Sequence, residues 1–216
     1  MSLFITFEGI EGSGKTTQIR RLATHLRERG HAVVQTREPG GCRIADAIRS
    51  ILLDAANANL VPTAELLLYA AARRQHVEEI IQPALAGGHI VLCDRFTDAT
   101  LAYQGFGRGL SLDLIAELNR LAGADLVPDL TLLFELPVAT GLGRALGRIE
   151  QSDGPAEDRF EQESLAFHER VRQGYLTLAE QNPHRFRLIA AAGAPDEVFA
   201  QAAAAIEDRL TARRLP

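Results

Sequence analysis

The chain has 216 residues, of which 46% are hydrophobic and 24% are charged, and its formal net charge is −5. This length and composition suit a single globular domain, and no apolar run approaches the ~20 residues that span a bilayer. The negative charge argues against broad nucleic-acid binding, which needs a basic surface. The N-terminus lacks the pattern of a secretory signal, and Cys42 and Cys93 are too few for a disulfide framework, so we expect reduced thiols in a cytoplasmic protein.

Short apolar segments alternate along the chain with segments whose apolar residues recur at helical spacing. Strands are predicted over residues 3–7, 32–36, 89–93, 130–135 and 186–189. Helices are predicted over residues 16–29, 45–53, 64–85, 111–121 and 162–180, and from Pro195 onward. The polar stretch 147–158 is predicted to be a mobile loop between two helices. This alternation indicates an α/β fold, a parallel five-stranded sheet with helices on both faces.

Residues 9–16 match the phosphate-binding pattern G-x-x-x-x-G-K-[ST] directly after the first predicted strand and before a predicted helix. Glycines let backbone N–H groups converge on phosphate, and the helix N-terminus adds its positive dipole end. Lys15, the only lysine in the chain, is expected to bridge the β- and γ-phosphates, and the Thr16 hydroxyl to ligate Mg²⁺. The predicted ATP-binding residues are Gly9, Ile10, Glu11, Gly12, Ser13, Gly14, Lys15, Thr16 and Thr17.

Asp94 follows the predicted strand 89–93 within the segment Val-Leu-Cys-Asp-Arg-Phe. A carboxylate there is either a turn or helix cap, or a group that holds the Mg²⁺ shell directly or through water. Ligands of parallel sheets gather at the carboxyl ends of the strands, which favours the second interpretation beside a phosphate loop.

Several arginines fall at predicted strand ends and in predicted helices and loops where a second anion could bind. They are Arg37, Arg49, Arg73, Arg74, Arg95, Arg144, Arg148 and Arg159. Each one alone reads as a solvated surface charge. Together they favour a kinase whose acceptor is itself a phosphate, since such an acceptor is already ionised and needs alignment and charge neutralisation more than a general base.

The segments FEGIEGSGKTT, TREPGG, YAAARRQH, CDRFTDATLAYQG and DRFEQES resemble bacterial thymidylate kinases, of the P-loop nucleoside-monophosphate kinase superfamily. The resemblance covers essentially the whole chain. It implies one kinase domain over residues 1–216 with a short lid at about residues 144–159. It also implies Mg²⁺-dependent phosphoryl transfer from ATP to dTMP, giving dTDP and ADP in dTTP biosynthesis, by a cytoplasmic homodimer.

The same resemblance implies the residues that bind dTMP. Arg95 would hold the acceptor phosphate, Tyr69 would stack on thymine, and Arg73 would bond the base O4. Thr100 and Gln104 would read the base edge. The full set is Glu11, Arg37, Glu38, Arg49, Tyr69, Arg73, Arg95, Thr100, Tyr103 and Gln104.

Glu11 is unusual because it places a carboxylate inside a phosphate-binding loop. The resemblance implies that Glu11 faces away from the triphosphate and accepts a hydrogen bond from the 3′-hydroxyl of dTMP, while Tyr103 crowds the 2′ position and favours deoxyribose. Because Ile10 and Gly12 carry no charge, an arginine of the lid would assist the transfer. The candidates are Arg144, Arg148 and Arg159, of which Arg148 and Arg159 are favoured.

Two other functions fit a phosphate loop. One is a P-loop kinase that acts on a different nucleotide or on a sugar. The other is a GTPase-type switch or regulatory binding module. The guanine-reading motif N-K-x-D, which would support the switch, is impossible because Lys15 is the only lysine.

Overall fold

The protein is described by a computed structural model that covers residues 2–149 and 159–213, without the side chains of 148 and 149. In these ranges five parallel strands form one sheet in the order β2-β3-β1-β4-β5. The strands are β1 (Leu3–Glu8), β2 (Val33–Arg37), β3 (Ile90–Asp94), β4 (Leu130–Glu135) and β5 (Phe186–Ala190). The predicted α/β fold with a five-stranded parallel sheet is confirmed.

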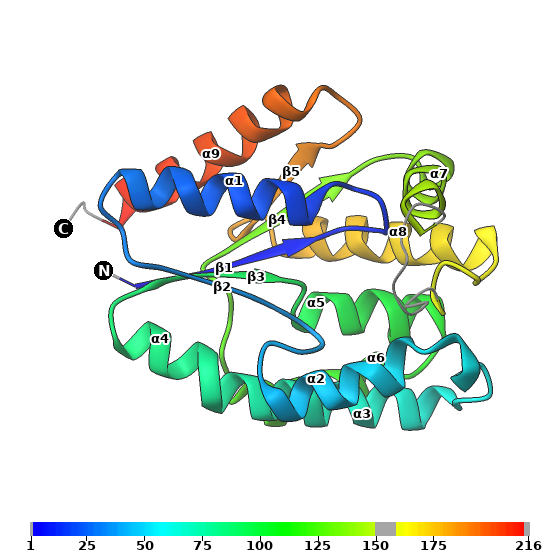
Figure 1. Ribbon diagram of the computed structural model, residues 1–216. Coiled ribbons are helices and arrows are strands. Elements are labelled where there is room, and N and C mark those ends of the chain that lie inside the picture. The colour runs from blue at the N-terminus through cyan, green and yellow to red at the C-terminus, as the bar shows by residue number, and fades with distance from the viewer. Residues whose placement is uncertain (1, 150–158, 214–216) are drawn as a thin grey trace.

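Helices cover both faces of this sheet, with α1 and α9 on one side and α2, α3, α4 and α6 on the other (Figure 1). Their bounds are α1 (Lys15–Glu28), α2 (Arg43–Leu53), α3 (Pro62–His76), α4 (Gln82–Ala86), α5 (Thr97–Thr100), α6 (Leu112–Gly123), α7 (Val138–Ile149), α8 (Leu165–Gln181) and α9 (Pro195–Ala212). A 3₁₀ turn spans Ala55–Asn57, and π-helical segments span Val77–Ile81 and Leu101–Gly107. Strand β1 begins, and helix α9 ends, at the end of the sheet opposite the loop that joins β1 to α1 (Figure 1).

The core forms where the sequence pattern places it. Every residue of β1 is buried, and the face of α1 that carries Ile19, Leu22, Ala23 and Leu26 packs onto the sheet. A strand buried on both faces reads as a continuous apolar run, as Leu3 to Phe7 does apart from Thr6. Thr6 is tolerated inside because its hydroxyl shares a hydrogen bond of 2.9 Å with that of Thr131 on β4.

Two helical predictions needed correction, and two helical segments had not been predicted. The predicted helix 64–85 is α3, a π-helical turn and α4 in succession, and Pro83 lies just past the turn. Proline lacks an N–H and crowds the carbonyl four residues earlier, so the regular ladder is interrupted there. Helix α8 begins at Leu165 rather than at residue 162, because Ser164 caps it by accepting the Phe167 N–H at 3.2 Å. The helical stretch of α5 and Leu101–Gly107 has no predicted counterpart, and neither does α7.

The predicted loop 147–158 is described only in part. Residues 147–149 form the end of α7, and residues 150–158 lie outside the described residues. Cys42 and Cys93 are free thiols, and both are buried. Among the described residues no helix combines the length and the apolar character needed to cross a bilayer.

Candidate active site

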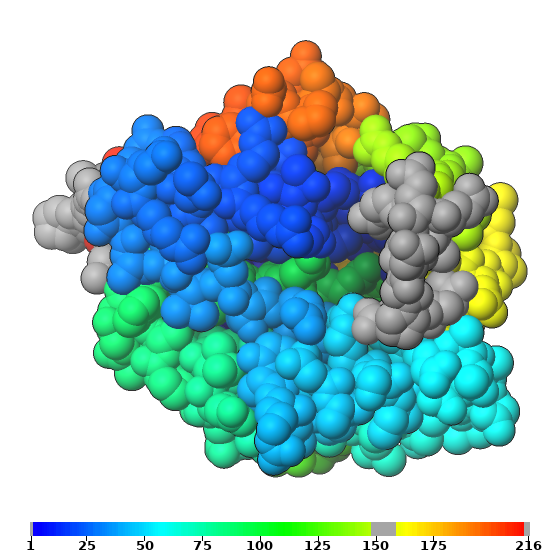
Figure 2. Space-filling view, viewed as in Figure 1, coloured from blue at the N-terminus to red at the C-terminus, as the bar shows by residue number. Residues whose placement is uncertain are grey.

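A cavity of about 250 Å³ opens at the carboxyl ends of β1 and β3. In the space-filling view the surface is recessed between the blue segment of β1 and α1 and the cyan segment of α2 and α3 (Figure 2). One end of the cavity is the phosphate loop, and the other is formed by α3, α5 and the π-helical segment Leu101–Gly107. Most predicted site residues line it: Glu11, Gly12, Ser13, Gly14, Lys15, Thr16, Thr17, Glu38, Arg49, Tyr69, Arg73, Asp94, Arg95, Thr100, Tyr103 and Gln104.

The phosphate loop is held against the start of α7. Gly12 has a φ of +68°, and a Cβ atom there would lie 1.9 Å from the carbonyl oxygen of Gly141. A Cβ on Gly141 would in turn lie 2.5 Å from the carbonyl oxygen of Glu11. Only glycine permits this backbone contact at both positions. The loop therefore has a fixed support on the side away from the cavity.

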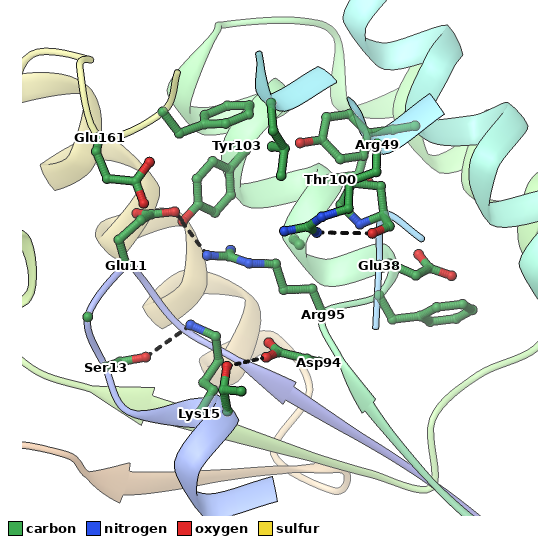
Figure 3. A pocket seen from close by; sticks show the side chains of 18 of the residues that line it. Glu11, Ser13, Lys15, Glu38, Arg49, Asp94, Arg95, Thr100, Tyr103 and Glu161 are labelled. Carbon is green, nitrogen blue, oxygen red and sulfur yellow. Dashed lines mark hydrogen bonds and ion pairs between the residues drawn. The ribbon is translucent and has the colours of Figure 1, made fainter. Parts of the chain in front are cut away.

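Lys15 is folded back onto its own loop. Its Nζ donates to the carbonyl oxygens of Gly9 and Ile10, both at 2.9 Å, and to the Ser13 hydroxyl at 3.0 Å (Figure 3). Burial, together with the positive charge of Arg95, lowers the pKa of Lys15 from 10.5 to about 8. The ammonium group thus lies at the floor of the cavity, close to where the loop N–H groups would meet phosphate.

Thr16 and Asp94 meet beside this lysine. The Thr16 hydroxyl donates to Asp94 Oδ2 at 3.0 Å (Figure 3). Both side chains line the cavity, and a hydroxyl next to a carboxylate is a donor set that suits Mg²⁺. Among residues 2–149 and 159–213, no three His, Cys, Asp or Glu side chains lie close enough together to form a metal-binding cluster.

Arg95 lies at the centre of the cavity. Its φ of +69° is in the left-handed region, which is strained for a residue with a side chain, and its N–H donates to the Phe7 carbonyl at 3.0 Å. Its guanidinium donates to Glu11 Oε1 at 2.9 Å and to the Tyr175 hydroxyl at 3.2 Å. The group also lies 4.6 Å from the centroid of the Tyr103 ring. The charge is therefore held in one place between a carboxylate and two aromatic residues.

Glu11 points toward Arg95 and away from Lys15 (Figure 3). Its Oε1 accepts from the Tyr103 hydroxyl at 2.5 Å as well as from Arg95, while Oε2 lies 3.4 Å from Nδ1 of the buried His168. Burial raises the pKa of the Glu11 carboxyl, but the charge of Arg95 and the contacts with His168 and Tyr103 outweigh it and bring the pKa to about 2. A second feature of Glu11 is that Oε2 is buried without a hydrogen-bond partner among the described residues.

Glu8 is a buried carboxyl at the end of β1, behind Arg95. It accepts from the Phe96 N–H and from the Tyr175 hydroxyl, each at 2.8 Å. Burial and the negative charge of Asp98 raise its pKa from 4.5 to about 8. Since Tyr175 also accepts from Arg95, the Glu8 carboxyl holds the backbone next to Arg95 directly and the Arg95 side chain through Tyr175.

At the other end of the cavity the Arg73 side chain is held by hydrogen bonds to four acceptors. Its guanidinium donates to Glu38 at 2.7 Å, Asn119 at 2.6 Å, Thr100 at 2.9 Å and the Phe96 carbonyl at 3.1 Å. The side chain is only 2% exposed, so these bonds provide the counter-charge and acceptors that a buried guanidinium requires. Four of the five N–H groups of Arg73 are thereby used, and one N–H on Nη1 remains as a fixed donor for a ligand in the cavity.

Some predicted residues do not line the cavity. Gly9 and Ile10 pack behind the loop, and Arg37 forms a surface ion pair with Asp46 at 3.0 Å. Arg144 donates to the Ala191 carbonyl at 3.1 Å. The buried Arg159 pairs with Glu65 at 2.6 Å and donates to the Leu52 carbonyl at 2.5 Å. Arg148 lies in the last turn of α7, and its side chain lies outside the described residues.

The structure also adds residues that the motifs did not single out. Phe160 and Glu161 line the cavity, while Glu8, Glu65 and Tyr175 lie behind it and contact residues that do. Glu65 precedes Tyr69 and Arg73 at intervals of four, so helical spacing alone could have placed it on their face. No short-range signal points to Tyr175, which reaches the site from α8.

Comparisons with known proteins agree with this geometry. The family model described as thymidylate kinase matches residues 7–202. A curated thymidylate kinase of Geobacter sulfurreducens is 67% identical over 189 residues, covering 88% of this chain and 89% of that protein. One of Trichlorobacter lovleyi is 60% identical over 211 residues, covering 98% of each. The crystal structure of thymidylate kinase from Ehrlichia chaffeensis has a TM-score of 0.71 and 40% identity, covering 88% of this chain and 93% of that one.

The phosphate loop, Arg95 and the residues of α3 and α5 line one cavity, and the similarity extends over almost the whole chain of these relatives. The chain belongs to the thymidylate kinase family.

Proposed function

We propose that the protein transfers the γ-phosphoryl group of ATP to the 5′-phosphate of dTMP, giving dTDP and ADP, as a step in dTTP biosynthesis. Membership of the thymidylate kinase family supports this reaction. The observation that carries it is the placement of Lys15 and Arg95 in one cavity whose far end is formed by Tyr69 and Arg73. Two phosphates and one base can thereby be held in line, which is the main requirement of phosphoryl transfer.

At the donor end, Lys15 would exchange its loop carbonyl partners for oxygens of the β- and γ-phosphates, while loop N–H groups hold the phosphates. Thr16 and Asp94 would hold Mg²⁺, since their oxygens already lie 3.0 Å apart in the cavity. When bound, the metal would supply positive charge to the phosphate oxygens.

At the acceptor end, Arg95 would bind the dTMP phosphate with help from Arg49, which lines the same cavity. Arg37 would have to leave Asp46 to contribute. The acceptor oxygen is already ionised, so its attack needs no general base. Glu11 would accept a hydrogen bond from the 3′-hydroxyl, and Tyr103 beside it would leave no room for a 2′-hydroxyl.

At the base end, the half-buried Tyr69 would stack on thymine, and Arg73 would donate to the base O4. Thr100 and Gln104 would complete the edge that reads the base. Glu38 would act through Arg73, because its carboxylate accepts from the Arg73 Nε.

For the lid, we propose that Arg148 supplies the positive charge that the phosphate loop lacks. Arg144 and Arg159 have their side chains engaged elsewhere, with Ala191 and with Glu65, and would first have to break those contacts. Closure over the transferring group would also exclude water that would otherwise hydrolyse ATP.

We further propose that the protein acts as a cytoplasmic homodimer of single-domain chains. Exposed apolar side chains on α2 and α3, such as Ile44, Ile51 and Leu67, offer a surface that a second copy could bury. Light scattering coupled to size exclusion would report the mass directly, and a monomer at micromolar concentration would contradict this part of the proposal.

The reaction is tested by measuring ADP release with dTMP, dUMP, dCMP, dAMP and dGMP as acceptors, with and without Mg²⁺. We expect the highest kcat/KM with dTMP and no turnover after chelation of the metal. A preference for any other acceptor would refute the assignment of dTMP.

A further inference from the structure

One face of α3 reaches both the base end of the cavity and the residues behind it. Glu65, Tyr69 and Arg73 follow one another at intervals of four residues and therefore share this face. Tyr69 and Arg73 line the cavity, whereas Glu65 is 0% exposed and lies behind Gln104.

The Glu65 carboxylate interacts with three side chains. Its Oε1 accepts from Gln104 Nε2 at 2.8 Å, and its Oε2 pairs with Arg159 Nη2 at 2.6 Å and Arg108 Nη2 at 3.2 Å. A fully buried carboxylate is costly without such partners, and the two guanidinium groups supply its counter-charge. Between these two cations the carboxylate acts only as a hydrogen-bond acceptor.

This arrangement restricts the amide of Gln104. A primary amide can present either its NH₂ group or its carbonyl oxygen, and it switches between them by a half-turn about the last side-chain bond. Because Glu65 accepts, the NH₂ group of Gln104 must point toward it. The carbonyl oxygen Oε1 is then the end that remains for a ligand in the cavity.

We propose that Glu65 is a specificity-determining positioning residue, which makes Gln104 an acceptor toward the base and so selects a pyrimidine that carries N–H at ring position 3. The inference rests on the proposed function, because the base must occupy the end of the cavity that Gln104 lines. Thymine offers that N–H and an acceptor at O4, whereas cytosine offers an acceptor at position 3 and an amino donor at position 4.

Arg73 discriminates between the same two bases at ring position 4. Its guanidinium is fixed by Glu38, Asn119 and Thr100, so the N–H that remains on Nη1 can bond an acceptor such as O4 but not an amino group. A donor from Arg73 beside an acceptor from Gln104 matches the edge of thymine and mismatches both positions of cytosine. Without the carboxylate of Glu65, Gln104 would be free to turn and offer its NH₂ group to cytosine.

The test compares kcat/KM for dTMP and for dCMP in variants of Glu65. Glu65→Gln keeps the shape of the side chain but can donate as well as accept, so Gln104 loses its fixed orientation. We expect the ratio of the two kcat/KM values, dTMP over dCMP, to fall by about tenfold or more, with KM for ATP changed less than about threefold. Glu65→Asp, which retains the charge for Arg108 and Arg159 but withdraws from Gln104, should lower the ratio too.

Glu163→Gln is the matched control. Glu163 pairs with another nitrogen of the same Arg108 and has no contact with Gln104 among the described residues. This variant also removes one carboxylate beside Arg108, yet it should leave the ratio unchanged.

A double-mutant cycle shows whether Glu65 acts through Gln104. In a Gln104→Leu background, Glu65→Gln should no longer change the ratio, because the amide that Glu65 orients is absent. An unchanged ratio in folded Glu65→Gln or Glu65→Asp, or an equal change in the Gln104→Leu background, would overturn the inference. Failure of the unmodified protein to phosphorylate dTMP would instead overturn the proposed function.

Discussion

Replacing Glu8 by glutamine should make the stability of the protein much less sensitive to pH. The Glu8 carboxyl is fully buried, and burial together with the charge of Asp98 raises its pKa from 4.5 to about 8. Between these two values the native state binds a proton that the unfolded chain has lost. Stability therefore falls as pH rises from 4.5 to 8, and the contribution of the proton is fully present only below 4.5.

The pKa values set the size of the effect. A difference of about 3.5 pKa units at about 1.36 kcal/mol each corresponds to roughly 5 kcal/mol, which we take as an upper bound. Glutamine is a neutral side chain with the shape of a protonated carboxyl, and its amide oxygen can accept from the Phe96 N–H as Glu8 Oε1 does. The variant should therefore gain ~2–5 kcal/mol in unfolding free energy relative to the unmodified protein between about pH 5 and pH 9.

Urea unfolding of both proteins across this pH range measures the difference directly. Titrating groups that do not interact with Glu8 contribute equally to the two proteins and cancel in the comparison, whereas the interaction of Glu8 with Asp98 is part of the measured difference. Glu117→Gln, at an exposed position on α6, is the control and should show no such trend. A difference between Glu8→Gln and the unmodified protein that stays constant with pH would refute the reasoning, because it would mean that Glu8 is ionised in the native state.

Three further predictions concern the reaction. Lys15→Ala should lower kcat by at least about a hundredfold with an unchanged circular dichroism spectrum, because its charge acts on the transferring phosphoryl group, and near-normal turnover would remove it from that role. Arg73→Ala should cost ~1–3 kcal/mol in kcat/KM for dTMP with little change in KM for ATP, whereas equal damage to both would indicate a structural role. Glu11→Ala should lower kcat/KM for dTMP by about one to two powers of ten, and the 3′-deoxy analogue should do the same with the unmodified protein. Variant and analogue together should lose less than the two losses added, since both delete one bond, and strict additivity would show that Glu11 does not touch the sugar.

The fold and the donor end of the site could be predicted from the sequence because they depend on neighbours in the chain. Residues 9–16 are contiguous, so the backbone of a strand, a glycine loop and a helix places Lys15 and Thr16 side by side without reference to the rest of the molecule. Helical spacing likewise places Tyr69 and Arg73 on one face of α3. The alternation of strands and helices indicates the parallel sheet for the same reason.

The surroundings of Arg95 could not be read from the sequence. Its partners Glu11 and Tyr175 are 84 and 80 residues away along the chain, and they meet because β1 and β3 end at the same edge of the sheet, where α8 packs against the segment Leu101–Gly107. The same dependence on packing explains why Arg159 is buried against Glu65, although its position in the sequence is that of a lid arginine.

Composition and periodicity therefore determined which elements form and which of them carries the phosphate loop. Tertiary packing decided which of many chemically identical arginines turn inward. An arginine is buried only where carboxylates or other oxygen acceptors from distant segments supply its counter-charge and hydrogen bonds, as Glu38, Asn119 and Thr100 do for Arg73. Arg37, one residue before Glu38, remains on the surface with Asp46 because only the folded chain determines which acceptors each one meets.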